Sequence, residues 1–331
     1  MAWIEVQITP RTGFSSPLAG STLFGQWCAC RAARAPGRLV ELLQGYTANR
    51  PFAVVGDPRP LGFVPRPTVP MYLFKGVSGI SSKEAKSRRW MPLDKANKLA
   101  LENWLEHCRT DHDLLPAGQP AAAWQREQAH AMRDSRIRAV EGSGEHVHHE
   151  TWFHAGVNLV LDVILDDDRL AQDEFLQVLE EIGWRGYGAG ASRGAGKFEI
   201  GSVARRTWRP AAPDESLLTL GHCTPLRVDR HRMLNSFYRA TVHHGRHGAL
   251  QEPGVPGAAG VVKAPVLMAS PGALFVPPPR YPLPFYGHGL GGDGSLSLRD
   301  PRTIHQGYAP ALPVKFARQA QSVTEREAAD D

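Results

Sequence analysis

The sequence has little cysteine and no long run of apolar residues. Its 4 cysteines have spacings that fit neither a zinc ribbon nor a disulfide framework: Cys28, Cys30, Cys108 and Cys223. The best candidate for a membrane span, 157–165, is too short to cross a bilayer and contains Asp162. Residues 1–9 alternate apolar and polar and lack the basic and apolar regions of a signal peptide. We therefore expect a protein of the reducing cytoplasm without a membrane partner.

The composition is that of a globular protein with many loops. Of 331 residues, 42% are hydrophobic and 21% are charged, and the length suits two domains. The 33 glycines and 27 prolines predict few long helices. The net charge of +5 permits a nucleic-acid partner without establishing one. It is unevenly placed, because 161–181 contains eight acidic residues and one arginine, whereas 185–209 contains six basic residues and one glutamate.

Hydrophobic periodicity predicts the order of elements in the first part of the chain. We expect three strands, at 1–9, 153–165 and 197–205. We expect helices at 22–33, with Ser21 as N-cap, at 95–108, and around the apolar stripe 175–182, where Gly183 would end it. With an insertion between its middle strands, this order is the outline of a ferredoxin-like βαββαβ domain, so the fold class is α+β.

Two domains are predicted. The first covers 1–212 and carries a large insertion at about 75–150. The second, 213–318, is expected to be a degenerate, strand-rich ferredoxin-like (RRM-like) domain with strands at 237–243, 261–268, 273–277 and 308–316. Residues 319–331 are predicted to form a disordered tail.

The strongest local signal is a glycine-rich segment between a predicted helix and a predicted strand. It has five glycines in eleven residues: Gly186, Gly188, Gly190, Gly194 and Gly196. Such a loop can turn N–H groups toward phosphate oxygens, and Arg193 and Lys197 add charge. Phe198 stands where a nucleotide-hydrolase loop needs Ser or Thr, and the helix-to-strand order reverses that of a dinucleotide-binding loop. A glycine-rich surface hairpin without a ligand is the alternative.

The same segment resembles a known loop. Gly-aromatic-Gly followed by Ser-Arg-Gly-x-Gly-basic-Phe, over 186–198, is similar to the glycine-rich loop of the RAMP superfamily, the RNA-binding proteins of CRISPR systems. Segments 9–25 and 51–67 resemble, respectively, the family's first strand with its helix entry and a stretch of the handle-capping subunit of the type III-A Csm complex. Segments 271–275 and 304–309 resemble its last strands, whereas 133–136 departs from the family's Asn-x-Ile-Asp-Arg-x-Thr pattern.

The resemblance implies a non-catalytic subunit of a type III CRISPR interference complex, without metal or cofactor. It would bind and cap the 5′ handle of the crRNA, and would contact the large polymerase-like subunit and a backbone RAMP subunit. The RNA-binding residues expected in the first domain are Ser21, Thr22, Gly186, Tyr187 as a stacking platform, Gly188, Gly190, Ser192, Arg193, Gly194, Gly196 and Lys197.

The insertion is expected to reach target RNA near the guide–target junction as a hairpin or thumb. Its candidate contacts are Lys83, Lys86, Arg88, Arg89, Trp90, Arg133 and Arg136. A solvated basic loop is the alternative for the run that ends at Trp90.

Two other functions stay open. The first is a RAMP-type endoribonuclease that processes precursor crRNA, because 14 histidines could supply acid–base groups, although the glycine-rich loop of those enzymes usually lies nearer the C-terminus. The second is a metal site in Glu145, His146, His148, His149, Glu150 and His154, for which a polar loop is the alternative. Residues His243, His244 and His247 could contact RNA or a partner, or be polar residues at a turn.

Overall fold

The computed structural model describes residues 1–76, 79–119, 121, 123–133, 145–247 and 262–316, with the backbone alone at 130–133 and 145–148. Its first sheet has the antiparallel spatial order β2-β8-β1-β9. These strands are β1 (Ala2–Pro10), β2 (Ala53–Val55), β8 (Leu159–Leu165) and β9 (Phe198–Arg206), and β3 (Arg59–Pro60) continues along β8. The order agrees with the split βαβ connectivity that the sequence predicts.

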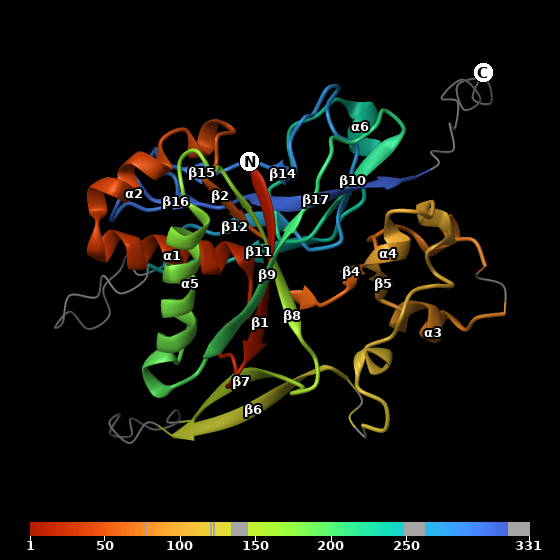
Figure 1. Cartoon of the computed structure of the whole chain (residues 1–331), viewed down its shortest axis with the longest axis horizontal. Helices are drawn as coiled ribbons and strands as arrows, with labels where there is room; N and C mark the ends of the chain where they lie inside the picture. The colour runs from red at the N-terminus through yellow and green to blue at the C-terminus, as the bar shows by residue number, and fades with distance from the viewer. Residues whose placement is uncertain (77–78, 120, 122, 134–144, 248–261, 317–331) are drawn as a thin grey trace.

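Two helices cover one face of this sheet (Figure 1): α1 (Gly20–Arg34) and α5 (Gln172–Arg185). The α5 stripe is buried as predicted, although the helix continues past Gly183 and has Gly186 as its C-cap. Helix α2 (Pro36–Leu43) and the 3₁₀ turn Tyr46–Ala48 follow α1. The α+β fold class is confirmed. None of the helices in the described part of the chain is long and apolar enough to span a bilayer.

The insertion is a small irregular module with a projecting ribbon. Strands β4 (Phe63–Pro65) and β5 (Trp90–Pro92) pair, and around them lie α3 (Ser82–Ser87), α4 (Leu93–Ala96) and 3₁₀ turns at Met71–Leu73, Leu101–Asn103 and His112–Leu114. The helix predicted at 95–108 is wrong, because Leu101, Trp104 and Leu105 are buried from successive turns rather than from one helix. The ribbon consists of β6 (Gln125–Arg133) and β7 (Glu145–Phe153).

The second half of the chain is strand-rich, as predicted. Its four-stranded antiparallel sheet has the order β13-β10-β17-β14, from β10 (Glu215–Thr219), β13 (Leu274–Phe275), β14 (Phe285–Gly287) and β17 (Tyr308–Lys315). Two ribbons pair β11 (Ala240–His243) with β12 (Val266–Ala269) and β15 (Leu290–Gly291) with β16 (Ile304–His305). The helix described here is α6 (Arg230–Leu234). The predicted tail, 319–331, lies outside the described residues.

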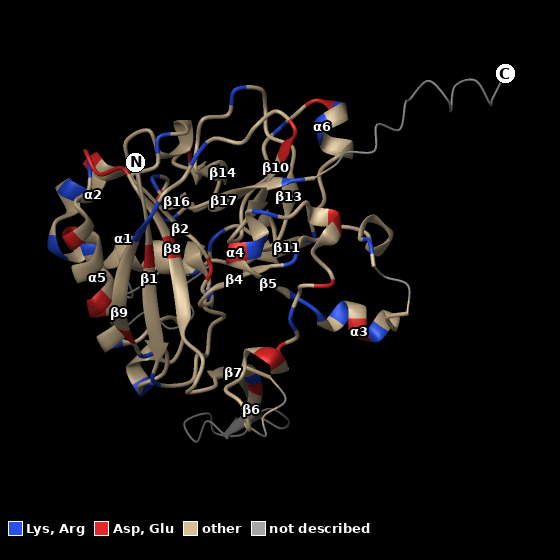
Figure 2. Cartoon of the chain, turned by 45° about the vertical axis from the view of Figure 1, so that its right-hand side comes forward, with Lys and Arg blue, Asp and Glu red and all other residues tan. Residues whose placement is uncertain are grey.

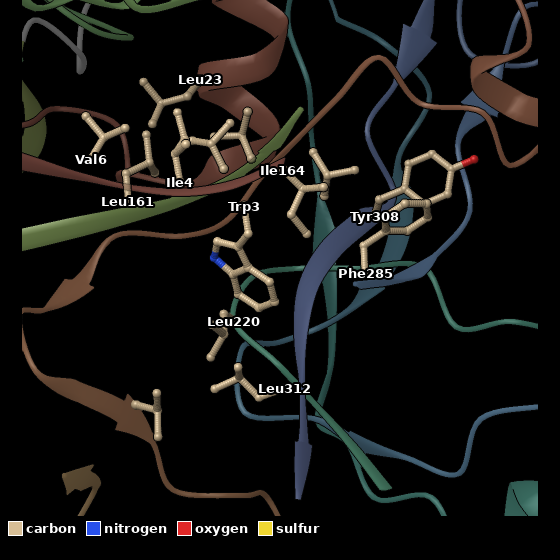
Figure 3. Packing of buried hydrophobic residues seen from close by; sticks show 14 of the residues in the cluster. Trp3, Ile4, Val6, Leu23, Leu161, Ile164, Leu220, Phe285, Tyr308 and Leu312 are labelled. Carbon is tan, nitrogen blue, oxygen red and sulfur yellow. The ribbon is translucent and has the colours of Figure 1, made fainter. Parts of the chain in front are cut away.

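The largest hydrophobic core contains residues of both halves. Trp3 and Ile164, which are register partners on β1 and β8, lie on the sheet face opposite Leu23 of α1, toward Leu220 and Leu312 (Figure 3). All five side chains are buried. The two halves therefore share one hydrophobic core and are not independent domains joined by a linker.

A buried ion network lies on the same face of the sheet. The Arg59 guanidinium donates to Asp162 Oδ2 at 2.7 Å and to Glu5 Oε1 at 2.8 Å, and the Trp3 indole donates to Asp162 Oδ1 at 2.9 Å. Arg59 is 3% exposed and Asp162 is fully buried. The acidic residue inside an otherwise apolar strand is thus satisfied by charge and by hydrogen bonds.

The C-terminal segment 304–309 ties the halves together through side chains. The Gln306 amide accepts from Val55 N at 2.8 Å and donates to Val55 O at 2.7 Å, so it continues the hydrogen bonding of β2. The Tyr308 hydroxyl donates to Tyr46 O at 2.6 Å. In this chain, the segment that resembles the family's last strand has a structural role.

Candidate nucleic-acid interface

The glycine-rich loop, 186–197, connects α5 to β9, and its five glycines all have positive φ, between 69° and 104°. A Cβ on Gly196 would lie 2.2 Å from the carbonyl oxygen of Tyr187, and one on Gly186 would lie 2.5 Å from that of Ala195. Both positions therefore require glycine for space as well as for conformation.

Most amides of the loop are bonded inside the protein. Tyr187 N donates to Gly196 O at 2.9 Å and Gly188 N to the Gln26 side chain at 3.0 Å. Two further amides bond hydroxyl groups of the segment that precedes α1: Ala189 N to Ser16 and Lys197 N to Thr12, both at 2.9 Å. In total, nine of the twelve amides have acceptors within the protein. These bonds fix the loop and leave few of its N–H groups for a ligand.

The exception is a run of three residues at the tip. The amides of Gly190, Ala191 and Ser192 have no acceptor among the described residues. Gly190 is left-handed (φ 78°, ψ 0°) and the 3₁₀ turn Ala191–Arg193 follows it. A left-handed residue before a helical one turns successive N–H groups toward one concavity, which suits an oxyanion. The main-chain donors available to a ligand are therefore confined to three residues of the loop.

Two exposed cations follow this tip in the sequence. Arg193 and Lys197 are exposed, and neither forms an ion pair within the described part of the chain. Their charges are therefore available to a ligand. Ser192, the last residue of the tip, is also exposed.

Tyr187 has a different role from the one predicted. Its ring is fully buried, 6.0 Å from that of Phe14, and its hydroxyl donates to Pro17 O at 2.6 Å and accepts from Ala19 N at 3.2 Å. Burial raises the pKa of this phenol. Tyr187 cannot stack on a base from this position; it anchors the loop to the segment before α1.

The start of α1 also differs from the prediction. The helix begins at Gly20 with Ala19 as N-cap, and the Gly20 amide donates to Asp57 Oδ1 at 2.8 Å. A carboxylate thus occupies the positive end of the helix that was expected to attract RNA. Ser21 is buried, and Thr22 is partly buried in the first turn of α1. We therefore retain neither residue as an RNA contact.

Trp184 is a candidate that the sequence analysis missed. It lies one residue before the end of α5 and is 74% exposed. The sequence carried this signal, because Trp184 does not continue the i, i+3, i+4, i+7 spacing of the buried stripe 175–182. Exposed aromatic rings beside cations are stacking platforms for single-stranded nucleic acid.

The basic run of the insertion divides into two parts. Arg88 pairs with Glu84 at 2.8 Å, Arg89 pairs with Asp111, and the Trp90 indole donates to Asp111 Oδ1 at 2.8 Å. Trp90 also packs edge-on against Trp124. These three residues hold the module together. Helix α3 lies at the edge of the molecule (Figure 2). Its residues Lys83 and Lys86 are exposed and form no ion pair in the described residues.

The β6–β7 ribbon extends away from the body of the protein (Figure 1), so the expected hairpin in the insertion is present. Arg133 ends β6, but its side chain and the whole of Arg136 lie outside the described residues. The side chains of His146 and His148 also lie outside them. No group of three or more His, Cys, Asp or Glu side chains that could hold a metal ion occurs in the described part of the chain.

Together these features define an α+β protein with a split βαβ sheet and a glycine-rich loop, fixed by internal hydrogen bonds, between α5 and β9. Solved structures with the same fold come from type III-A CRISPR complexes. A chain of the Csm1–Csm4 cassette in complex with AMPPNP matches with a TM-score of 0.57 and 14% identity, over 96% of this chain and 100% of that one. A chain of the Csm3–Csm4 subcomplex matches with a TM-score of 0.52 and 12% identity over the same shares.

The cassette in complex with cA4 gives a TM-score of 0.55 at 14% identity, over 96% of this chain and 100% of that one. The subunit common to both kinds of assembly is Csm4. At this identity the likeness shows a shared fold. No protein-family model and no curated protein sequence matches the chain.

Proposed function

We propose that this chain is a non-catalytic subunit of a type III CRISPR interference complex in the cytoplasm that caps the 5′ handle of the crRNA. The observation that carries the proposal is the likeness in fold to Csm4 over 96% of the chain. Since Csm4 is found with Csm1 and with Csm3 in those structures, we assign two protein partners. They are a large polymerase-like subunit and a backbone RAMP subunit. In this proposal, 1–212 and 213–318 are two ferredoxin-like RAMP domains.

The glycine-rich loop supplies the grip on the handle. A phosphate of the RNA sits at the amides of Gly190–Ser192, and the exposed Arg193 and Lys197 neutralise its charge and that of its neighbour. A splayed base stacks on the exposed ring of Trp184. Since most loop amides are already bonded within the protein, little conformational freedom is lost when RNA binds.

The insertion serves a second segment of RNA in this proposal. Helix α3 offers Lys83 and Lys86, and the β6–β7 ribbon projects beyond the body as a thumb toward the guide–target junction. The remaining residues of the basic run shape the module, because their charged and polar groups are already paired.

A pull-down of the tagged chain from its native host, with sequencing of the bound RNA, tests the proposal. We expect guide RNAs that share one 5′ handle, recovered with a large polymerase-like subunit. Recovery of repeat RNA cut at one position would instead favour the processing endoribonuclease. Recovery of no defined RNA would contradict both functions.

A further inference from the structure

A second group of basic side chains lies away from the glycine-rich loop, where the two halves of the chain meet. It contains His222, which follows β10, His243 at the end of β11, Lys263 before β12, and His305 at the end of β16. The His243 and His305 rings are 5.0 Å apart. The main-chain N–H of Lys263 donates to the carbonyl of Gly245, two residues after His243. The motif 243–247 thus contributes to a cluster rather than to a simple polar turn.

One carboxylate faces this cluster, and it is already engaged. Asp57 Oδ1 accepts from the Gly20 amide at 2.8 Å, and Asp57 Oδ2 bonds His222 Nδ1 at 2.6 Å. This contact directs Nδ1 toward Asp57, and Nε2 can donate to a ligand when the ring is protonated. Asp57 raises the pKa of His222 against the opposing effect of burial. Asp57 therefore orients His222 but does not neutralise the other members.

Lys263 is the unusual member. Its side chain is largely buried and forms no ion pair with any described carboxylate, and the Cys28 thiol of α1 is the acid that most affects it. Burial lowers the pKa of Lys263. Largely buried lysines are nearly always paired, because an isolated ammonium loses its hydration.

The pKa values of His243 and His305 are lowered as well. Burial, together with the charges of His222 and Lys263, lowers the pKa of His243, with a smaller effect from His244. Burial and the charges of His243, Lys263 and His222 lower the pKa of His305 to about 3. The side chain of Arg239 adds further positive charge next to His222. Within the described part of the chain, Asp57 is bonded to His222, and the Lys263 ammonium has no ion pair.

We propose that Lys263, His243 and His222 form a binding site for a phosphate group at the junction of the two halves. Phosphate oxygens accept from the ammonium and from imidazole N–H groups, and the phosphate charge compensates the cluster. His305, 6% exposed and beside His243, backs the site rather than contacting the ligand. The phosphate belongs either to RNA or to a free nucleotide, and the site does not depend on the function proposed for the loop.

Histidine-selective ¹⁵N NMR of the full chain tests this site, with inorganic phosphate, AMP and hexauridylate as probes. We expect the His222 and His243 signals to shift in a saturable way. Lys263→Met should weaken binding about tenfold, as for loss of one charge-assisted hydrogen bond. Lys263→Arg should retain most of it. Lys98→Met, at an exposed lysine, is the matched control and should change nothing. The proposal would be overturned if Lys263→Met left the shifts of the His222 and His243 signals unchanged for all three probes.

The probes distinguish the source of the phosphate. Tighter binding of hexauridylate than of AMP assigns the site to RNA, and the reverse assigns it to a nucleotide. The double variant Arg193→Ala/Lys197→Ala should lose handle RNA yet keep phosphate binding at this site. Failure of the loop proposal and failure of this one are therefore separable.

Discussion

The glycine-rich loop and the basic run of the insertion look alike in sequence and differ in structure. Both combine closely spaced cations with an aromatic residue. In the loop, Arg193 and Lys197 are exposed and unpaired within the described residues, whereas in the run Arg88 and Arg89 pair with carboxylates. The aromatic residues of the two segments are alike, since both Tyr187 and Trp90 serve packing. The exposed ring next to the loop is that of Trp184, at the end of α5. A cation therefore counts as a binding residue only when the fold leaves it without a partner.

Whether a cation is paired also matters in the interior of the protein. Arg59 is the extreme case of a paired cation, because it is buried between Asp162 and Glu5. The predictions below test whether pairing decides what a cation does, beginning with Arg59 and ending with Arg89.

The largest effect is expected for Arg59→Ala. The substitution leaves Asp162 buried and uncompensated, so we expect a loss of about 3–5 kcal/mol in the free energy of unfolding. Urea denaturation measures it. The double variant Arg59→Met/Asp162→Leu removes both charges and should lose much less. A single variant as stable as the wild type would show that the network contributes nothing.

The double variant Arg193→Ala/Lys197→Ala should weaken binding of handle RNA about 30- to 100-fold, as for two charge-assisted contacts. It should also reduce the slope of log affinity against log salt by roughly 1.4, since each phosphate contact on a single strand contributes about 0.7. Fluorescence anisotropy at several salt concentrations measures both. The midpoint of thermal unfolding should not change, because neither side chain has an ion-pair partner among the described residues.

Trp184→Ala should reduce affinity for the same RNA about tenfold, within the roughly 1–3 kcal/mol found for a base stacked on an aromatic ring. Trp184→Phe should restore most of the affinity. Competition binding with the unlabelled RNA distinguishes the two variants. Equal affinities of the alanine variant and the wild type would remove Trp184 from the interface.

The smallest effect is expected for Arg89→Ala. Its pair with Asp111 is half exposed, so we expect a loss of less than about 1 kcal/mol of stability and no change in RNA affinity. Lys83→Ala/Lys86→Ala should do the opposite, with unchanged stability and weaker binding to a guide–target duplex by a few-fold. A reversed pattern would mean that pairing does not decide the role of these cations.

Much of the first half could be predicted from sequence, because its signals are local. The strands β1 and β9, the apolar stripe of α5 and the glycine-rich loop follow from period and composition alone. The helix predicted at 95–108 was wrong, because the buried residues of this segment have helical spacing but lie on short, irregular turns.

The roles of individual site residues depend on partners far away in the chain. The carboxylate at the start of α1 comes from Asp57, 37 positions after Gly20, and the acceptor of the Tyr187 hydroxyl is Pro17, 170 positions before it. Asp111, which pairs with Arg89, lies 22 positions beyond it. Such pairings require the fold, so the sequence identified the loop but not which of its groups remain available.

Ultraviolet cross-linking of the assembled ribonucleoprotein, with mass spectrometry of the cross-linked peptides, tests the central claim most directly. The account predicts that the 5′ handle cross-links within 184–197, at Trp184, at the loop tip 190–192 and at Arg193. These cross-links should disappear in the Arg193→Ala/Lys197→Ala variant. Handle cross-links confined to 82–90, with none in 184–197, would contradict it.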